Sequence, residues 1–172
     1  MSHLQQVDTQ FDCLEVICFI IDESEFYCIW FSDDKTDGFL LDGSILKVFQ
    51  SKDAALTFLK SFSSYKKIIK TTTYNANKIV QIVMRTIPFD SHIVLDFWNI
   101  VGDLSNSIGI PYEGNKKDNL TNSIYDKLFY GNNLPTINTS TRIYTPQFTG
   151  EEQVRLTTIL KDGISLVRKM NL

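Results

Sequence analysis

The sequence predicts an α+β fold, with a small N-terminal antiparallel sheet and one helix followed by a mainly helical C-terminal half. Near the N-terminus, short runs rich in Val, Ile, Cys and Phe are typical of strands. After them, Ser51 has the features of a helix N-cap. From about residue 75 onward, apolar residues recur at three- and four-residue steps, which is the spacing of an amphipathic helix.

The predicted sheet begins with a hairpin. Residues 14–21 and 26–31 form its strands, with alternating or fully buried faces, and the acidic run between them forms the turn. Short strands at 39–41 and 45–49 follow, and the apolar stripe of a helix at 52–62 is expected to cover the sheet. Residues 65–74 fit a strand or an irregular connector equally well.

Each helix of the C-terminal half has a predicted start or stop. Asn75 caps a helix that ends before Pro88, and Asp90 or Ser91 caps the strongest stripe of the chain, which ends at Gly109. A helix at 120–130 ends at Gly131. Thr149 and Glu152 form a capping box, in which each side chain bonds the other residue's amide, at the start of the last helix. In the middle helices, we expect Trp98 and Phe129 in the core and leave Tyr112 and Tyr130 open.

Composition predicts one domain, residues 1–172, with a β-rich part at about 11–62 and a helical part at about 75–172. The 172 residues are 43% hydrophobic and 22% charged, which suffices for one core. The three cysteines form no CxxC pair and are expected to be buried free thiols in a reducing compartment. No signal peptide and no membrane-length apolar run is visible, so we expect a cytoplasmic protein. The sequence does not determine its oligomeric state.

Charge is unevenly distributed along the chain. Residues 22–42 carry seven acids and one base, whereas residues 43–85 carry eight bases and one acid. The two segments either complement each other or form surfaces of opposite sign. The Lys60–Lys78 segment, with Tyr65 and Tyr74 interleaved, indicates a nucleic-acid-binding or regulatory module as the alternative function, although a pI near 5.3 does not favour nucleic acid as a partner.

Motifs for chemistry are sparse. Asp96 and Asp103 are seven residues apart and share a helix face, and His92 is the one interior histidine, so an enzyme site around these three residues is a third hypothesis. Neither histidine has a partner at metal-ligand spacing, and no phosphate-binding glycine motif occurs. We therefore expect no enzyme, no metal and no cofactor.

Two runs of the sequence carry a family resemblance. They are Phe97–Trp98–Asn99 through Asp103 and Ser107, and then YDKLFYGNNLP at 125–135, extended by Tyr144, Pro146 and Glu152. These residues resemble immunity proteins of bacterial polymorphic toxin systems, particularly contact-dependent growth inhibition. The likeness covers roughly Tyr74 to the C-terminus, and the N-terminal part agrees in type alone, with strands and then a helix.

The resemblance implies a protein that binds and neutralises a cognate toxin C-terminal domain, often a nuclease, without catalytic residues of its own. A groove that binds phosphates is positively charged, so complementary acids would speed encounter and fix register. From charge density we expect the partner-binding residues to be acids of the 22–42 segment, with Tyr27 or Trp30 as an aromatic anchor; the acids are Asp22, Glu23, Glu25, Asp33, Asp34 and Asp37.

Overall fold

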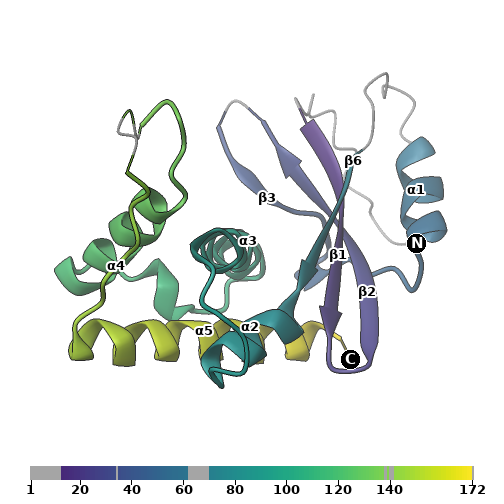
Figure 1. Ribbon diagram of the computed structural model, residues 1–172. Helices are drawn as coiled ribbons and strands as arrows, with labels where there is room; N and C mark the ends of the chain where they lie inside the picture. The colour runs from purple at the N-terminus through teal and green to yellow at the C-terminus, as the bar shows by residue number, and fades with distance from the viewer. Residues whose placement is uncertain (1–12, 34, 62–69, 138, 140–141, 172) are drawn as a thin grey trace.

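The computed structural model describes residues 13–33, 35–61, 70–137, 139 and 142–171, and it has an α+β fold. A mixed sheet and one helix form the N-terminal half, and the C-terminal half is mainly helical (Figure 1). The helices are α1 (Lys52–Lys60), α2 (Ala76–Val83), α3 (Ser91–Ile108), the 3₁₀ turn η1 (Glu113–Asn115), α4 (Asn119–Gly131) and α5 (Gly150–Met170). The strands are β1 (Cys13–Ile21), β2 (Ser24–Ser32), β3 (Asp37–Phe39), β4 (Leu41–Asp42), β5 (Ile45–Leu46) and β6 (Lys70–Asn75).

The main sheet has the strand order β3-β2-β1-β6. β1 and β2 form the predicted hairpin, and Asp22 at its turn has a φ of 54°. The expectation of an antiparallel sheet is wrong at one edge, because β6 pairs with β1 in parallel. The chain leaves the sheet, forms α1 on one face and then returns along β1 in the same direction, so this pairing rests on contacts remote in sequence.

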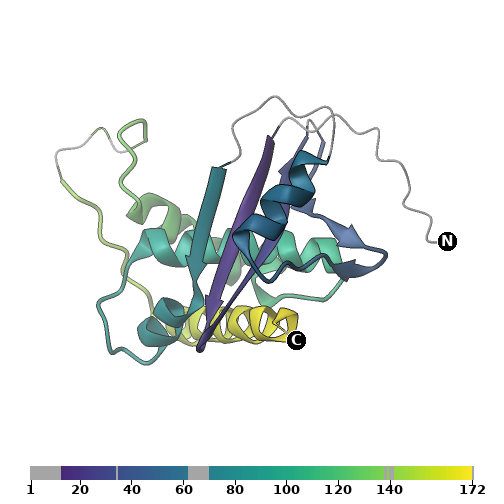
Figure 2. The same ribbon diagram turned by 90° about the vertical axis from the view of Figure 1, so that its right-hand side faces the viewer.

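Both faces of the sheet are buried, which explains the continuous apolar character of β1. Leu14 and Val16 pack with Ala55 and Leu59 of α1 on one face. Ile17, Phe19 and Ile21 point to the other face, into the core shared with α2, α3 and α5. Figure 2 shows α1 over its face of the sheet, and Figure 1 shows α3 on the opposite side, with α4 beyond it.

Most helix caps lie where the sequence places them. Ser51, Asn75 and Asp90 each accept a hydrogen bond from a first-turn backbone N–H, and Thr149 and Glu152 form the capping box. Asp118 caps α4, an N-cap that the sequence prediction missed. Gly109 has the left-handed φ of 69° that an αL cap requires.

Gly131 differs from its expected role as the stop of α4. It is the last helical residue, and Asn133 adopts the left-handed conformation with a φ of 49°. A Cβ on Gly131 would lie 2.6 Å from Ser91 Oγ and 3.2 Å from Pro146 Cδ. The glycine therefore permits close contact between α4, α3 and the segment that precedes α5.

The cysteines are free, but only two are buried as expected. Cys18 and Cys28 are buried, and burial raises the pKa of both thiols. Cys13 is exposed, because it lies at the open end of β1.

Candidate functional site

One face of α3 stays polar in the folded chain. His92, Asp96, Asn99, Asp103 and Asn106 recur at steps of four and three residues, so they form a stripe on one side of the helix. The sequence contains no Lys or Arg between Arg85 and Lys116. This stripe therefore carries acids and amides with His92 as its one basic side chain.

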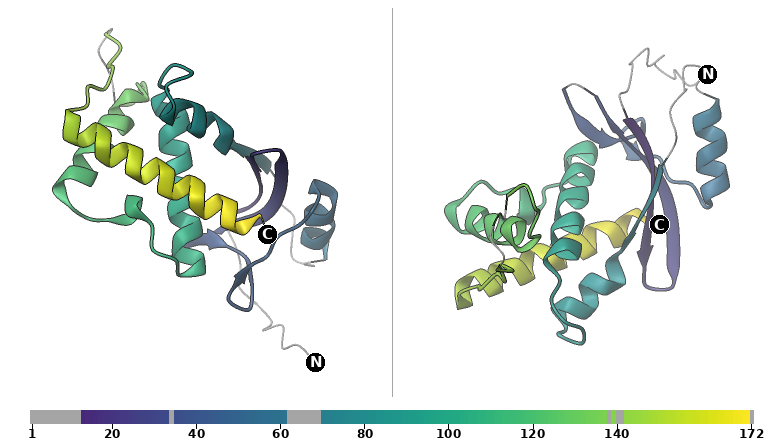
Figure 3. Two further views of the ribbon diagram at one scale, coloured as in Figure 1. Left: turned by 90° about the horizontal axis from the view of Figure 1, so that it is seen from below. Right: turned by 45° about the horizontal axis from the view of Figure 1, so that its top comes forward.

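The stripe lies between the sheet and α4. Asn99, Asp103 and Asn106 line one cavity there, Asp96 lines a second, and we call the two cavities together the α3 groove. Figures 1 and 3 show α3 lying between these two walls. A cavity of about 660 Å³ fills the side towards α4, and a smaller one of about 150 Å³ lies between the N-terminal half of α3 and β6. The larger cavity is lined by polar side chains, among them Asp37, Asn99, Asp103, Asn106, Asn115, Lys116, Lys117, Asn122, Tyr125 and Asp126.

The acids of the stripe lean towards the sheet. Trp30 Nε1 on β2 donates a hydrogen bond to Asp103 Oδ2 at 2.9 Å. Burial raises the pKa of the Asp103 carboxyl, the bond from Trp30 lowers it, and the negative charge of Asp37 raises it. A half-buried carboxylate that has one neutral donor and an acidic neighbour gains free energy if a cationic group approaches it.

Asp96 is in a comparable environment about two turns earlier on α3. Its Oδ2 lies 2.8 Å from His92 Nδ1, and 48% of its side chain is exposed. Burial raises the pKa of Asp96, and the nearby His92 lowers it. Asp96 and Asp103 therefore share a helix face, as the spacing predicts, and both favour positive charge in the groove.

The amides of the stripe bond the far wall of the groove: Asn99 joins α3 to α4, and Asn106 accepts a hydrogen bond from Asn115 of η1. Tyr125 OH donates to Asn99 Oδ1 at 3.0 Å, and the Tyr125 ring meets the Trp98 ring edge-on at 5.6 Å. Trp98, buried in the core as expected, donates from Nε1 to the Gly114 carbonyl oxygen at 3.0 Å. A Cβ on Gly102 would lie 3.0 Å from Asn115 Oδ1, so the glycine lets that side chain line the groove closely.

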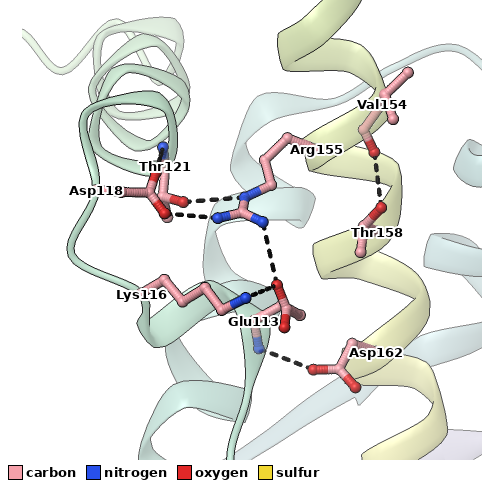
Figure 4. Close-up of polar contacts among 8 residues, drawn as sticks. All are labelled: Glu113, Lys116, Asp118, Thr121, Val154, Arg155, Thr158 and Asp162. Atoms are coloured by element: carbon pink, nitrogen blue, oxygen red, sulfur yellow. Dashed lines mark hydrogen bonds and ion pairs between the residues drawn. The ribbon is translucent and has the colours of Figure 1, made fainter.

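Arg155 of α5 positions the lysine-bearing rim of the groove (Figure 4). Its guanidinium donates to Glu113 at 3.2 Å, to Asp118 at 2.6 Å and to Thr121 at 3.3 Å. Glu113 in turn pairs with Lys116 at 2.7 Å. A rigid guanidinium with several donors suits this task, because it ties the 3₁₀ turn and the start of α4 to one point on α5.

The structure divides the acids predicted to bind a partner. Asp37 lines the α3 groove, and Asp33 accepts hydrogen bonds from the backbone N–H groups of Lys35 and Thr36 in the β2–β3 turn. Glu23 and Glu25 are exposed at the opposite end of β2. Nine strand residues separate the two ends by about 26 Å.

The remaining residues that the sequence predicted to bind a partner lie on different faces of the sheet or outside the described residues. Trp30 contacts the groove through Asp103, whereas Tyr27 packs on the α1 side of the sheet and donates to Glu25 Oε1 at 2.8 Å. Asp22 is paired with Arg168 of α5 at 2.8 Å. Asp34, and residues 62–69 of the predicted basic segment, lie outside the described residues. Trp30 and Asp37 are thus the predicted binding residues that belong to the α3 groove.

The residues that carry the family resemblance contact one another. Lys127 Nζ bonds both carboxylate oxygens of Glu152, at 2.8 Å and 2.7 Å. The Asn133 amide accepts from Tyr144 N at 2.7 Å and donates to the Tyr144 carbonyl oxygen at 2.9 Å. These bonds fix the end of α4 to the segment that leads into α5.

Phe129, expected in the core, lies at the surface, with 36% of it exposed. Tyr130 and Tyr144 are 54% and 39% exposed, and the three rings touch in sequence, at centroid distances of 6.1 Å and 6.4 Å. Tyr112, left open by the sequence, is buried. Sequence reasoning missed the exposure of Phe129 because ring placement at the end of a helix depends on the tertiary fold.

Within the described ranges, no group of three or more His, Cys, Asp or Glu side chains is placed to hold a metal ion. Among the helices of that same part of the chain, none has both the length and the apolar character needed to cross a membrane.

Comparisons with known proteins give one distant structural similarity. No family model matches the chain, and no curated protein matches it. A crystal structure of the SatS C-terminal domain in complex with bromine is similar with a TM-score of 0.48 and 11% sequence identity, over 92% of this chain and 90% of that one. At this distance the similarity assigns no function.

Proposed function

We propose that this protein is a cytoplasmic immunity protein that binds a cognate toxin domain, a nuclease, and blocks it through a stoichiometric interface centred on the α3 groove. The family resemblance supplies the functional class. The location of the interface rests on the polar stripe of α3. Its Asp96 and Asp103 lie in the α3 groove, and burial raises the pKa of both carboxyls.

Electrostatics supports this pairing of surfaces. A nuclease presents a positive groove to its substrate, and a negative surface of similar shape competes for it. Desolvated carboxylates gain more from an incoming Lys or Arg than fully hydrated ones do, because the local dielectric is lower. The acids of α3 oppose phosphate, so this face of the groove does not favour nucleic acid as a ligand.

Neutralisation of a toxin tests the class of function. The probe is the C-terminal domain of the protein encoded directly upstream of this gene, where the proposal places the toxin, expressed alone and together with this protein. We expect growth arrest by the toxin alone, growth in the presence of this protein, and a one-to-one complex on purification. Absence of both protection and complex would contradict the proposed function.

Two pairs of substitutions test the location. Removing both groove charges, Asp96→Asn with Asp103→Asn, should slow association about tenfold and weaken its dependence on salt, because steering by charge acts mainly on the association rate. The matched control removes two exposed acids at the far end of the hairpin, Glu23→Gln with Glu25→Gln, and should leave the rate unchanged. The opposite pattern would place the interface at the hairpin end, among the acids predicted from sequence.

A further inference from the structure

Three exposed aromatic rings, Phe129, Tyr130 and Tyr144, form a cluster at the C-terminal end of α4, which we call the ring cluster. Exposed aromatic surface of this kind is typical of interface hot spots. Leu134 and Ile137, which are 41% and 42% exposed, lie in the turn that follows α4 and add apolar surface.

The chain holds this cluster in a defined position. Asn133 bonds both the N–H and the carbonyl of Tyr144, and Gly131 packs against Ser91 and Pro146. These contacts fix the backbone on both sides of the rings while the rings themselves stay accessible. Rings that are ordered before binding lose less conformational entropy when a partner covers them.

The ring cluster continues the wall of the α3 groove. Asn122, Asp126 and Tyr130 follow one another at four-residue steps, so they lie on one face of α4, and the first two line the groove. Lys127 is neutralised by Glu152, and Asp126 is exposed on the same face of α4 as Tyr130. This edge of the groove therefore matches a surface that carries a basic residue next to an apolar pocket.

We infer that the ring cluster is the apolar anchor of the same interface, with Tyr130 seated in an apolar pocket of the toxin domain beside its basic groove. This inference rests on the proposed function and adds a division of roles. The acids of α3 act on the association rate, and the ring cluster acts on the dissociation rate, because a desolvated anchor must leave its pocket before the complex separates.

The test measures binding of the upstream-encoded toxin domain by surface plasmon resonance. Tyr130→Ala should raise Kd by about thirtyfold, mostly through faster dissociation, whereas Tyr130→Phe should stay within about threefold of the unsubstituted protein. Val154→Ala is the control, because Val154 is 69% exposed on α5 and should leave Kd unchanged. Circular dichroism and thermal unfolding establish that each variant is folded.

The outcomes separate this inference from the proposed function. If the unsubstituted protein does not bind the toxin domain, both fail. If it binds, and the Asp96 and Asp103 variant associates slowly while Tyr130→Ala binds normally, the proposed function stands and the anchor is refuted. Equal losses for Tyr130→Ala and Tyr130→Phe would also refute the anchor, because they would assign the effect to the hydroxyl group and not to the ring.

Discussion

The ion pair between Glu152 and Lys127 should make stability depend on pH in a defined way. The Glu152 side chain is 5% exposed, and it accepts hydrogen bonds from Lys127, from the backbone N–H of Thr149 and from Ser123. The ion pair with Lys127 first, and then the Thr149 N–H, lower the pKa of Glu152 from 4.5 to about 2. At about 1.4 kcal/mol per pH unit, this shift corresponds to about 3 kcal/mol at pH 7.

The sign follows from the direction of the shift. Because the folded pKa is lower than the unfolded one, the stabilisation is complete well above 4.5 and is lost as pH falls from there towards 2. Glu152→Gln should therefore lower the free energy of unfolding by about 3 kcal/mol at pH 7 and by about 1.4 kcal/mol at pH 3. Urea unfolding, followed by the fluorescence of the two tryptophans, measures both values.

Glu151→Gln is the matched control. Glu151 lies in the same first turn of α5 and shares the helix-dipole effect, but it is exposed. Its substitution should cost less than about 1 kcal/mol at pH 7, with little change at pH 3. Equal destabilisation by Glu152→Gln at both pH values would refute the electrostatic explanation and leave packing as the cause.

Three further predictions concern the groove and its supports. Gly131→Ala should destabilise the fold by about 1–3 kcal/mol in thermal unfolding, because its Cβ would overlap Ser91, whereas Gly150→Ala, which has open space around it, should not. Arg155→Lys should speed the hydrogen exchange of backbone amides at 113–121, because an ammonium group cannot keep all three contacts of the guanidinium. Unchanged exchange would show that Arg155 does not hold this segment against α5. Asp103→Asn should keep or raise stability at pH 7, since burial raises this carboxyl's pKa and penalises its charged form, and a clear loss in urea unfolding would contradict that reasoning.

Local sequence determined the elements and most of their ends. The hairpin turn, the N-caps at Ser51, Asn75 and Asp90, and the capping box at Thr149 depend on bonds between residues two or three positions apart. The stripe of α3 is likewise a property of helical spacing. These features depend on residues that are close together in the chain and not on contacts between distant segments, so the sequence predicts them correctly.

Only the tertiary structure decided how those elements combine. The parallel pairing of β6 with β1, the contact of Gly131 with Ser91 and the exposure of Phe129 each depend on chain segments brought together by the fold. The candidate site follows the same rule. The acids that we selected from charge density in the sequence lie at opposite ends of β2, about 26 Å apart. The α3 groove instead brings Trp30 and Asp37 of the sheet next to residues more than sixty positions later in the chain. Residue spacing specifies which side chains share a helix face, but long-range packing of the core decides which elements lie against that face.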